Sequence, residues 1–145
     1  MKILVQRVLE ASVRVDGEIT GKIGRGLLVF LGVERNDTQK QADFLANKLV
    51  NLRIFEDENE KMNLSVQDIK GEILVISQFT LAADTSQGNR PGFSNAEDPT
   101  IAKEMYNYFN DVLKSKGFPP QNGVFQADMK VCLINDGPAT FILSK

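Results

Sequence analysis

Residues 77–93, SQFTLAADTSQGNRPGF, bring together several side chains that could take part in hydrolysis. Ser77 and Thr80 supply hydroxyl groups, and Gln78 lies between them with an amide. A hydroxyl is a weak nucleophile near neutral pH unless a neighbouring base activates it. The chain contains no histidine, and the only carboxylate in this segment is that of Asp84. If this segment hydrolyses a bond, the group that accepts the proton of the attacking hydroxyl still has to be identified.

Residues 77–81 occupy a place where a chain often exposes reactive groups. They follow EILVI, whose last four residues form an apolar run typical of a buried strand. The end of a strand is a rigid mount, and residues just past it are open to a ligand. An ordinary turn rich in serine and threonine would have the same composition, so both interpretations stay open here.

Residues 135–140, NDGPAT, form a second unusual segment. Asn, Asp and Gly are turn formers, and a simple hairpin loop between two strands would explain them. Pro138 also removes a backbone donor at a strand junction, and Gly137 leaves the main chain bare, with carbonyl groups that can point outward. These features favour a specialised turn, although the sequence leaves the isomer of the Gly137–Pro138 bond open.

Alternating or continuous apolar residues predict strands on both sides of these segments. The pair Asp16–Gly17 suits a hairpin turn between two of them. GLLVFLGV is typical of a fully buried strand. The predicted strands are ILVQRV, ASVRVDG, EITGKIG, GLLVFLGV, RIF, EILVISQF, GVFQADMKVCLI and ATFIL, the last two joined by NDGP.

Two helices are predicted from apolar residues spaced three and four apart. The first begins after an N-cap at Asp37 or Thr38. The second has Asp98 as its N-cap and Pro99 at its first position, and Gly117 ends it. The predicted buried stripe of this second helix is Ile101, Met105, Tyr108, Val112 and Leu113.

These elements predict an α+β fold, built as a single domain over residues 1–145. We expect two main helices and a curved, barrel-like antiparallel β-sheet, because the connections read as hairpins. A chain of 145 residues is long enough to bury such a core by itself.

The amino-acid composition excludes several classes of function. The net charge of −2 and the pI near 5.2 give no overall attraction to nucleic acid or to an anionic membrane. With one cysteine and no histidine, the common zinc sites are excluded. Gln6 and Arg7 interrupt the first apolar run, and no apolar stretch approaches the roughly 20 residues of a membrane span. We therefore expect a cytoplasmic protein without a metal and without a cofactor.

The segments SQFTLAADT, RPGFS, GVFQADM and NDGPATF, in this order and spacing, resemble the D-aminoacyl-tRNA deacylase (D-tyrosyl-tRNA(Tyr) deacylase) family. The likeness extends over essentially the whole chain. Members of this family hydrolyse the ester between a D-amino acid and the terminal ribose of tRNA, a chiral proofreading step that frees the tRNA. The resemblance implies the acceptor end of tRNA as the partner and a homodimer with active sites at the subunit interface.

The resemblance also implies which side chains line the pocket. Ser77, Gln78, Phe79 and Thr80 would be its catalytic residues, and Met129 would lie close by and contact the substrate.

A peptide wall would supply the chiral selection. The resemblance implies that the Gly137–Pro138 bond is cis, that this pair reaches into the partner's pocket, and that Arg7 holds it. If the amino group and the ester of the substrate are anchored, the side chain of an L-amino acid must point at one wall, and a rigid main-chain wall rejects it. Gly137 would be needed because a Cβ would invade the pocket. Such a wall cannot reject glycine, so glycyl-tRNA, including tRNA(Ala) mischarged with glycine, should be cleaved too.

Two mechanisms remain open. In the first, Thr80 is a covalent nucleophile, although no histidine can activate it. In the second, the ribose 2′-OH of the substrate or a water beside it is positioned for attack, and backbone amides around Phe79 and Thr80 form an oxyanion hole. We favour the second mechanism.

Two other functions fit the same residues. A hydrolase of free D-amino acid esters would ignore the RNA, and a non-catalytic RNA or protein interaction module would cleave no ester at all. The acidic pI also requires that any tRNA be bound at its acceptor end by few cations, with a shallow salt dependence. The candidate cations are Arg7, Lys22, Arg25, Lys48, Arg53 and Arg90.

Overall fold

The computed structural model describes residues 1–145, and strand β3 (Gly26–Gly32) lies at its centre. β1 (Lys2–Val15) pairs antiparallel with one edge of β3, and β6 (Glu72–Ser77) pairs parallel with the other. All residues of β3 are buried except Phe30, which is half-buried. The apolar run that predicted a fully buried strand therefore forms the middle of the sheet.

The main sheet has the strand order β2-β1-β3-β6-β7. β3 pairs with the first half of β1 and β2 with its second half, and β8 pairs with β1 along the opposite edge. β2 (Glu18–Ile23) forms the predicted hairpin with β1 through the turn at Asp16–Gly17. β7 (Gln121–Asn122) is short, whereas β8 (Lys130–Ser144) runs along almost the whole of β1. The short strands β4 (Phe55–Glu56) and β5 (Met62–Leu64) form a separate pair.

The sheet is mixed, and the prediction of an antiparallel sheet was wrong for one half of it. β3 and β6 run parallel, and so do β6 and β7. Helix α1 (Gln39–Val50) lies between β3 and β6 in the chain, and helix α2 (Pro99–Ser115) lies between β6 and β7. Parallel neighbours need a long crossover connection, usually with a helix. Each of the two predicted helices lies in such a crossover. The prediction failed because it treated the connections between strands as hairpins.

The number of strands agrees with the prediction, but the strands themselves differ. ILVQRV and ASVRVDG merge into the single strand β1, and KVCLI and ATFIL merge into the single strand β8. Two strands that were not predicted, β5 and β7, make up the number. GVFQADM is not a strand, since residues 123–129 form a loop between β7 and β8.

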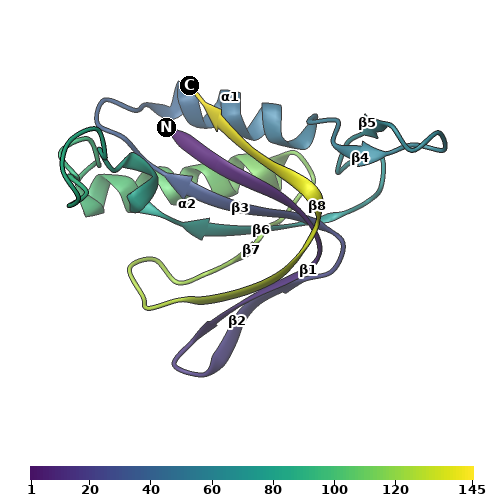
Figure 1. Cartoon of the computed structure of the whole chain (residues 1–145), viewed down its shortest axis with the longest axis horizontal. Coiled ribbons are helices and arrows are strands. Elements are labelled where there is room, and N and C mark those ends of the chain that lie inside the picture. The colour runs from purple at the N-terminus through teal and green to yellow at the C-terminus, as the bar shows by residue number, and fades with distance from the viewer.

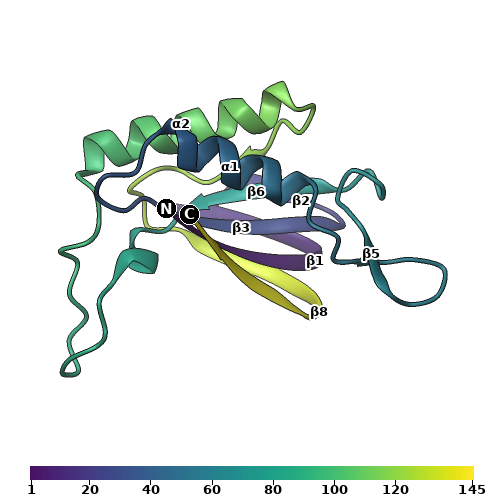
Figure 2. The same cartoon turned by 90° about the horizontal axis from the view of Figure 1, so that it is seen from above.

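The two helices lie side by side on one face of the sheet (Figure 2). Thr38 is the N-cap of α1 and forms a capping box with Gln41. The Asp98 side chain accepts a hydrogen bond from the Thr100 amide at the start of α2, as its role as N-cap predicts. The buried stripe of α2 is rotated from the predicted one, because Ile101 is exposed. The buried residues of this helix are Tyr106, Phe109 and Leu113.

Two apolar cores lie on opposite faces of the sheet. The larger one fills the space under the helices, and the smaller one lies around Val13, Leu28 and Leu74, where β1, β2 and β8 curl away from the helices (Figure 1). β2 also comes close to β7: a Cβ on Gly21 would lie 2.8 Å from the backbone oxygen of Asn122. The sheet is therefore nearly closed and barrel-like, as predicted.

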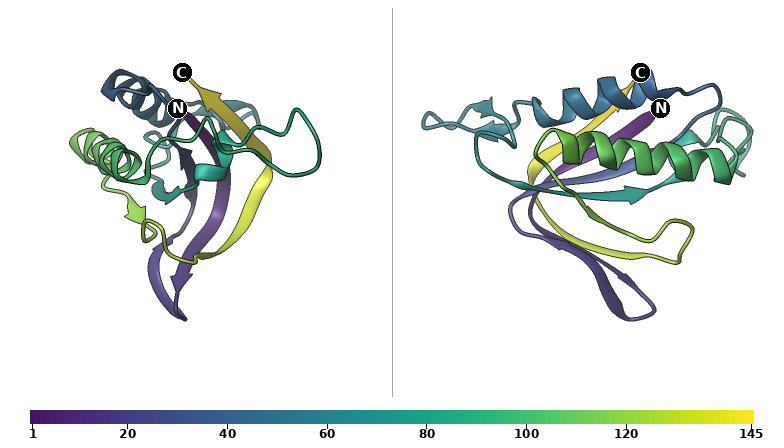
Figure 3. Two further views of the ribbon diagram at one scale, coloured as in Figure 1. Left: turned by 90° about the vertical axis from the view of Figure 1, so that its left-hand side faces the viewer. Right: turned by 180° about the vertical axis from the view of Figure 1, so that it is seen from behind.

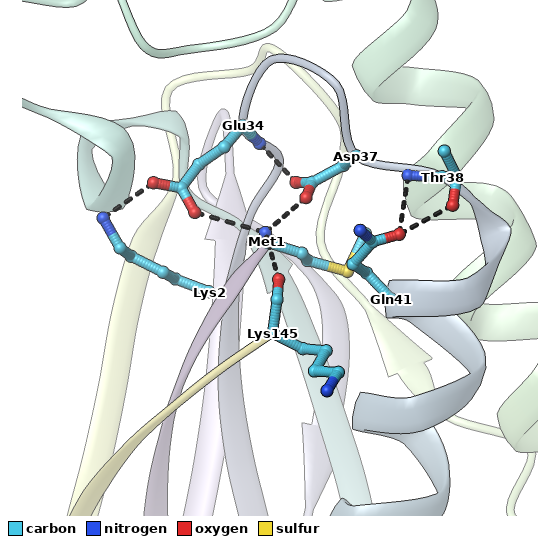
Figure 4. Close-up of polar contacts among 7 residues, drawn as sticks. All are labelled: Met1, Lys2, Glu34, Asp37, Thr38, Gln41 and Lys145. Atoms are coloured by element: carbon cyan, nitrogen blue, oxygen red, sulfur yellow. Dashed lines mark hydrogen bonds and ion pairs between the residues drawn. The ribbon is translucent and has the colours of Figure 1, made fainter.

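The first and last residues of the chain lie side by side, where an ion cluster binds them (Figure 4). The Met1 ammonium lies 2.5 Å from Asp37 Oδ1, 3.2 Å from Glu34 Oε2 and 3.1 Å from the Lys145 carbonyl oxygen. Lys2 Nζ lies 2.7 Å from the other oxygen of Glu34. The cluster fixes the segment that leads from β3 into α1. No helix in the structure has the length and apolar character that crossing a membrane requires.

Candidate functional site

A cleft of about 560 Å³ opens at the carboxyl end of β6. Three parts of the chain line most of it: residues 76–79, the start of α2 with the segment before it, and residues 125–129. In a parallel β-α-β unit, the ends of the strands and the beginnings of the helices meet at one edge of the sheet. The cleft is at this edge, and it contains Ser77, Gln78, Phe79 and Met129 of the predicted site.

Ser77 to Thr80 pass from the strand into a short 3-10 helix, η1 (Phe79–Ala82). The Gln78 amide donates to the Leu31 carbonyl at 2.7 Å and so extends the β3–β6 ladder past Ser77. The Gln78 side-chain amide donates to Thr80 Oγ1, which leaves the hydroxyl hydrogen of Thr80 free for another acceptor. The amides of Phe79 and Thr80 open η1, where the first N–H groups of a helix have no partner within it.

No carboxylate is placed to take a proton from Thr80. Asp84 accepts a hydrogen bond from the backbone amide of Ser86, and bonds from Ser86 hold the pKa of Asp84 below its usual value. Glu97 and Asp128 line the cleft, but Glu97 accepts from the Asp98 amide, and Asp128 pairs with Lys130 at 2.7 Å. The lowered pKa of Asp84 also makes that carboxylate a weaker base. The geometry therefore gives Thr80 no general base.

Phe79 and Phe93 form an exposed aromatic pair beside the cleft. Their ring centroids lie 5.1 Å apart, and 59% of Phe79 is exposed. Two hydrogen bonds between Asp84 and Gly92, both of 2.8 Å, close the loop that precedes Phe93. This loop projects away from the body of the protein (Figure 3) and carries the exposed Arg90.

Arg7 is buried, with 3% of its surface exposed, and its guanidinium binds main-chain oxygens. Nε donates to the Asp136 carbonyl and Nη1 donates to the Ile54 carbonyl, both at 2.6 Å. Glu56 lies 3.6 Å away and provides a countercharge. Arg7 thus binds the residue directly before Gly137 within the same chain.

Residues 136–139 form a bulge in one continuous strand, and the prediction that NDGP joins two hairpin strands was wrong. Thr140 pairs with Gln6, and Asn135 pairs with Val8, so the four residues of this 136–139 bulge lie opposite Arg7 alone. Both halves of β8 pair with the same strand in the same direction, which a hairpin cannot do. The Gly137–Pro138 bond is cis, as expected, and both of its residues are exposed.

The structure brings Ser77, Gln78, Phe79 and Met129 together in the cleft. Thr80 is exposed at the next position and does not line the cleft, and the bulge lies away from all of these residues. Arg7 pairs with Leu27 at the beginning of β3, whereas Ser77 pairs with Leu31 at its end. These rows are roughly 13 Å apart along the strand, and β6 and β8 are three strand spacings of about 4.8 Å apart. Within one chain, the bulge and the cleft are therefore separate.

Several residues of the cleft were not predicted from the sequence. Ala96, Glu97 and Phe125 line it alongside the predicted residues. The available signal was the start of α2 at Asp98 and Pro99, because a helix that follows strand β6 in a crossover begins near the end of that strand.

Three comparisons connect this geometry with known proteins. The model of the family described as D-Tyr-tRNA(Tyr) deacylase matches residues 4–144. The D-aminoacyl-tRNA deacylase of Geotalea daltonii is 60% identical over 143 residues, which cover 99% of this chain and 95% of that protein. A solved structure titled c-Myc DNA Unwinding Element Binding Protein has a TM-score of 0.95 and 44% identity, and the match covers 100% of this chain and 99% of that one. A probable eukaryotic D-amino acid tRNA deacylase, at 14% identity, shares the fold with a TM-score of 0.85 and coverage of 99% and 98%.

Proposed function

The chain belongs to the D-Tyr-tRNA(Tyr) deacylase family and hydrolyses the ester of D-aminoacyl-tRNA, and we propose that each of its active sites is completed by a second copy. In this proposal, the cleft at the end of β6 belongs to one protomer, and the 136–139 bulge that closes it belongs to the other. The observation that carries the proposal is the separation of the two segments within one chain. A bulge that cannot reach its own cleft can still enter that of a partner.

The surface around β8 supports an assembly of two copies. β8 pairs only with β1, so its other edge is free, and free edges are usually covered or blunted. Large apolar side chains are exposed on these two strands: Leu9 at 52%, Ile134 at 50% and Ile142 at 67%. Exposed apolar residues next to an unpaired strand edge favour burial against another chain. The bulge stands on this strand, with Gly137 and Pro138 exposed.

The bulge would act as the peptide wall that rejects L-amino acids. Its main chain is held by Arg7 through the Asp136 carbonyl, so it would yield little to a side chain that presses on it. Overlap with immobile backbone costs more than overlap with a mobile side chain. A D-amino acid with the same anchored groups would direct its side chain away from the wall. The wall would therefore select by handedness and not by side-chain type.

In the chemical step, we assign attack to the ribose 2′-OH of the substrate or to a water beside it. Thr80 has no base within reach, and the carboxylates of the cleft are engaged elsewhere. The Thr80 hydroxyl would instead donate a hydrogen bond to the substrate. The amides of Phe79 and Thr80 would stabilise the oxyanion, a contribution of about 10²–10³ in rate for each donor. Orientation of the attacking group can remove roughly 7–11 kcal/mol of the barrier.

The acceptor end of tRNA would be bound by few cations. Arg7 is buried, Arg25 lies over the Phe55 ring, and Arg53 Nε donates to the Asn63 carbonyl. Arg90 is exposed on the loop beside the cleft, which makes it the best placed of the candidate cations. We place the reaction in the cytoplasm, where charged tRNA is used.

The test is deacylation of D-tyrosyl-tRNA and L-tyrosyl-tRNA by the purified protein, with the ethyl ester of D-tyrosine in parallel. We expect fast release from D-tyrosyl-tRNA alone. Equal hydrolysis of both tRNA esters would contradict the peptide wall. Equal hydrolysis of the tRNA ester and the ethyl ester would identify a hydrolase of small esters instead.

A further inference from the structure

We propose that Asn135 is a positioning residue that sets the shape of the 136–139 bulge and thereby the rejection of L-amino acids. This inference rests on the proposed function, in which the bulge is the peptide wall. It concerns how one chain holds that wall before a partner is present.

The Asn135 side chain bridges the base of the bulge. Nδ2 donates to the Ala139 carbonyl at 3.3 Å and to the Arg7 carbonyl at 3.2 Å. The β1–β8 register skips Arg7, since Gln6 pairs with Thr140 and Val8 with Asn135, so the Arg7 carbonyl has no ladder partner from β8. The Asn135 amide takes the place of that missing ladder bond. It ties the two ends of the bulge to each other and to β1.

The same side chain explains why residue 137 is glycine. A Cβ built on Gly137 would overlap Asn135 Oδ1, and it would lie 3.1 Å from Asn135 Cγ and 3.2 Å from the Ala139 amide nitrogen. The sequence had suggested that glycine is needed because a Cβ would enter the partner's pocket. The structure adds a reason within the chain itself: a Cβ at 137 would force the Asn135 side chain out of the place from which it binds the Arg7 and Ala139 carbonyls.

Arg7 and Asn135 therefore hold the bulge from two sides. Arg7 Nε binds the Asp136 carbonyl at the start of the bulge, and Asn135 binds the Ala139 carbonyl at its end. The Asn135 side chain packs under Gly137 in between. A site that discriminates by shape must be held within about 0.5 Å by the residues around it. If Asn135 is replaced, the bulge stays anchored at Asp136 but loses the side chain that supports Gly137.

The first experiment compares Asn135→Asp and Asn135→Ala with the wild-type protein on D- and L-tyrosyl-tRNA. Aspartate keeps the shape of asparagine but has no donor for the two carbonyls. We expect both variants to raise the rate on L-tyrosyl-tRNA relative to the D-ester by about tenfold, which corresponds to about 1.4 kcal/mol. Asn107→Ala, on the exposed surface of α2, is the matched control and should leave the ratio unchanged.

The second experiment is a double-mutant cycle between Asn135 and Gly137. Gly137→Ala alone should lower the melting temperature, because its Cβ meets Asn135. Asn135→Ala in the same chain should recover part of that loss, so that the double variant is more stable than Gly137→Ala. The double variant should still admit L-tyrosyl-tRNA, since the support of the bulge is gone.

The outcomes separate this inference from the proposed function. A wild-type protein that consumes both enantiomers equally would contradict the proposed function. A wild-type protein that discriminates, with Asn135→Asp and Asn135→Ala just as selective and no rescue of Gly137→Ala, would overturn the role of Asn135 alone.

Discussion

Arg7 and Ser77 lie at opposite ends of β3 and on opposite sides of it: Arg7 pairs with Leu27 across one edge, and Ser77 pairs with Leu31 across the other. Each of these two residues positions one of the two candidate parts of the site. Ser77 leads into the turn that lines the cleft, and Arg7 binds the 136–139 bulge through the Asp136 carbonyl. One chain thus carries both halves of a site but keeps them apart.

Thr80→Ala should retain substantial activity, with a loss of no more than about tenfold, the value expected for one ordinary hydrogen bond. The reason is that Thr80 is a hydrogen-bond donor in this account and not the nucleophile. A D-tyrosyl-tRNA that ends in 2′-deoxyadenosine should react at least about a hundredfold more slowly, because the positioned 2′-OH is missing. The measurement is the single-turnover deacylation rate of Thr80→Ala on the normal substrate and of the wild-type protein on the deoxy substrate.

The opposite pattern would restore Thr80 as the nucleophile. In that case Thr80→Ala would be inactive, and the deoxy substrate would react normally. Asp84→Asn is the control for the only acidic side chain of residues 77–93. It should have little effect because Asp84 accepts a hydrogen bond from Ser86.

Glycyl-tRNA should be cleaved at a rate comparable with that of a D-aminoacyl-tRNA. Glycine has no side chain to meet the peptide wall, so a steric filter for handedness admits it. The measurement is release of labelled glycine from glycyl-tRNA, with L-alanyl-tRNA as the matched substrate that carries one methyl group more. A glycyl ester that survives saturating enzyme would argue against a purely steric wall.

Replacement of Arg7 by methionine should lower the free energy of unfolding by about 3 kcal/mol. The side chain keeps its bulk, but the buried Ile54 carbonyl and the half-buried Asp136 carbonyl lose their donors, and a buried carbonyl left unpaired costs about 1–3 kcal/mol. Urea unfolding measures this loss. Arg14→Met, on the exposed part of β1, is the control and should change stability by less than about 0.5 kcal/mol. Equal effects of the two substitutions would remove Arg7 as the anchor of the bulge.

Glu34→Gln should destabilise the protein at neutral pH, and the difference from wild type should shrink in acid. Burial raises the pKa of Glu34, but hydrogen bonds and charges from Lys2 and the Met1 ammonium outweigh it, so the pKa lies below its usual value of 4.5. A carboxylate with a lowered pKa in the folded state contributes stability above its unfolded pKa, and this contribution is lost as the pH falls through the folded pKa.

Thermal unfolding from pH 7 down to pH 3 tests this expectation. Glu104→Gln, on the exposed face of α2, is the control for the loss of one negative charge. A stability difference between wild type and Glu34→Gln that stays constant over this range would contradict the role of the ion cluster in Figure 4.

The elements set by local chemistry could be predicted from the sequence. Asp98 and Gly117 mark the beginning and the end of α2, and Asp16–Gly17 forms the turn between β1 and β2. Each of these features depends on residues within a few positions of one another, so sequence patterns capture them. The segment at residues 77–80 was also placed correctly at the end of a strand.

Features that depend on which distant segments pair could not be predicted in this way. The face of α2 that is buried depends on how the helix sits on β6, and Ile101 proved to be exposed. The parallel pairings of β3 with β6 and of β6 with β7 each depend on one long crossover. NDGP has turn composition, but β1 pairs with the chain on both sides of it, and it therefore forms a bulge. The contact between Asn135 and Gly137 follows from that bulge and has no sequence signal of its own.

A heterodimer of two differently blocked chains tests the two-chain site most directly. Pro138→Trp enlarges the bulge so that it cannot enter a partner's cleft, and Ala127→Trp fills the cleft of its own chain. Each variant alone should be inactive on D-tyrosyl-tRNA. Co-expressed with different tags and purified as the mixed dimer, the pair should recover about half of the wild-type activity, because one of two symmetric sites then has an intact cleft and an intact bulge. A mixed dimer that stays as inactive as its parents would contradict a site shared between two chains.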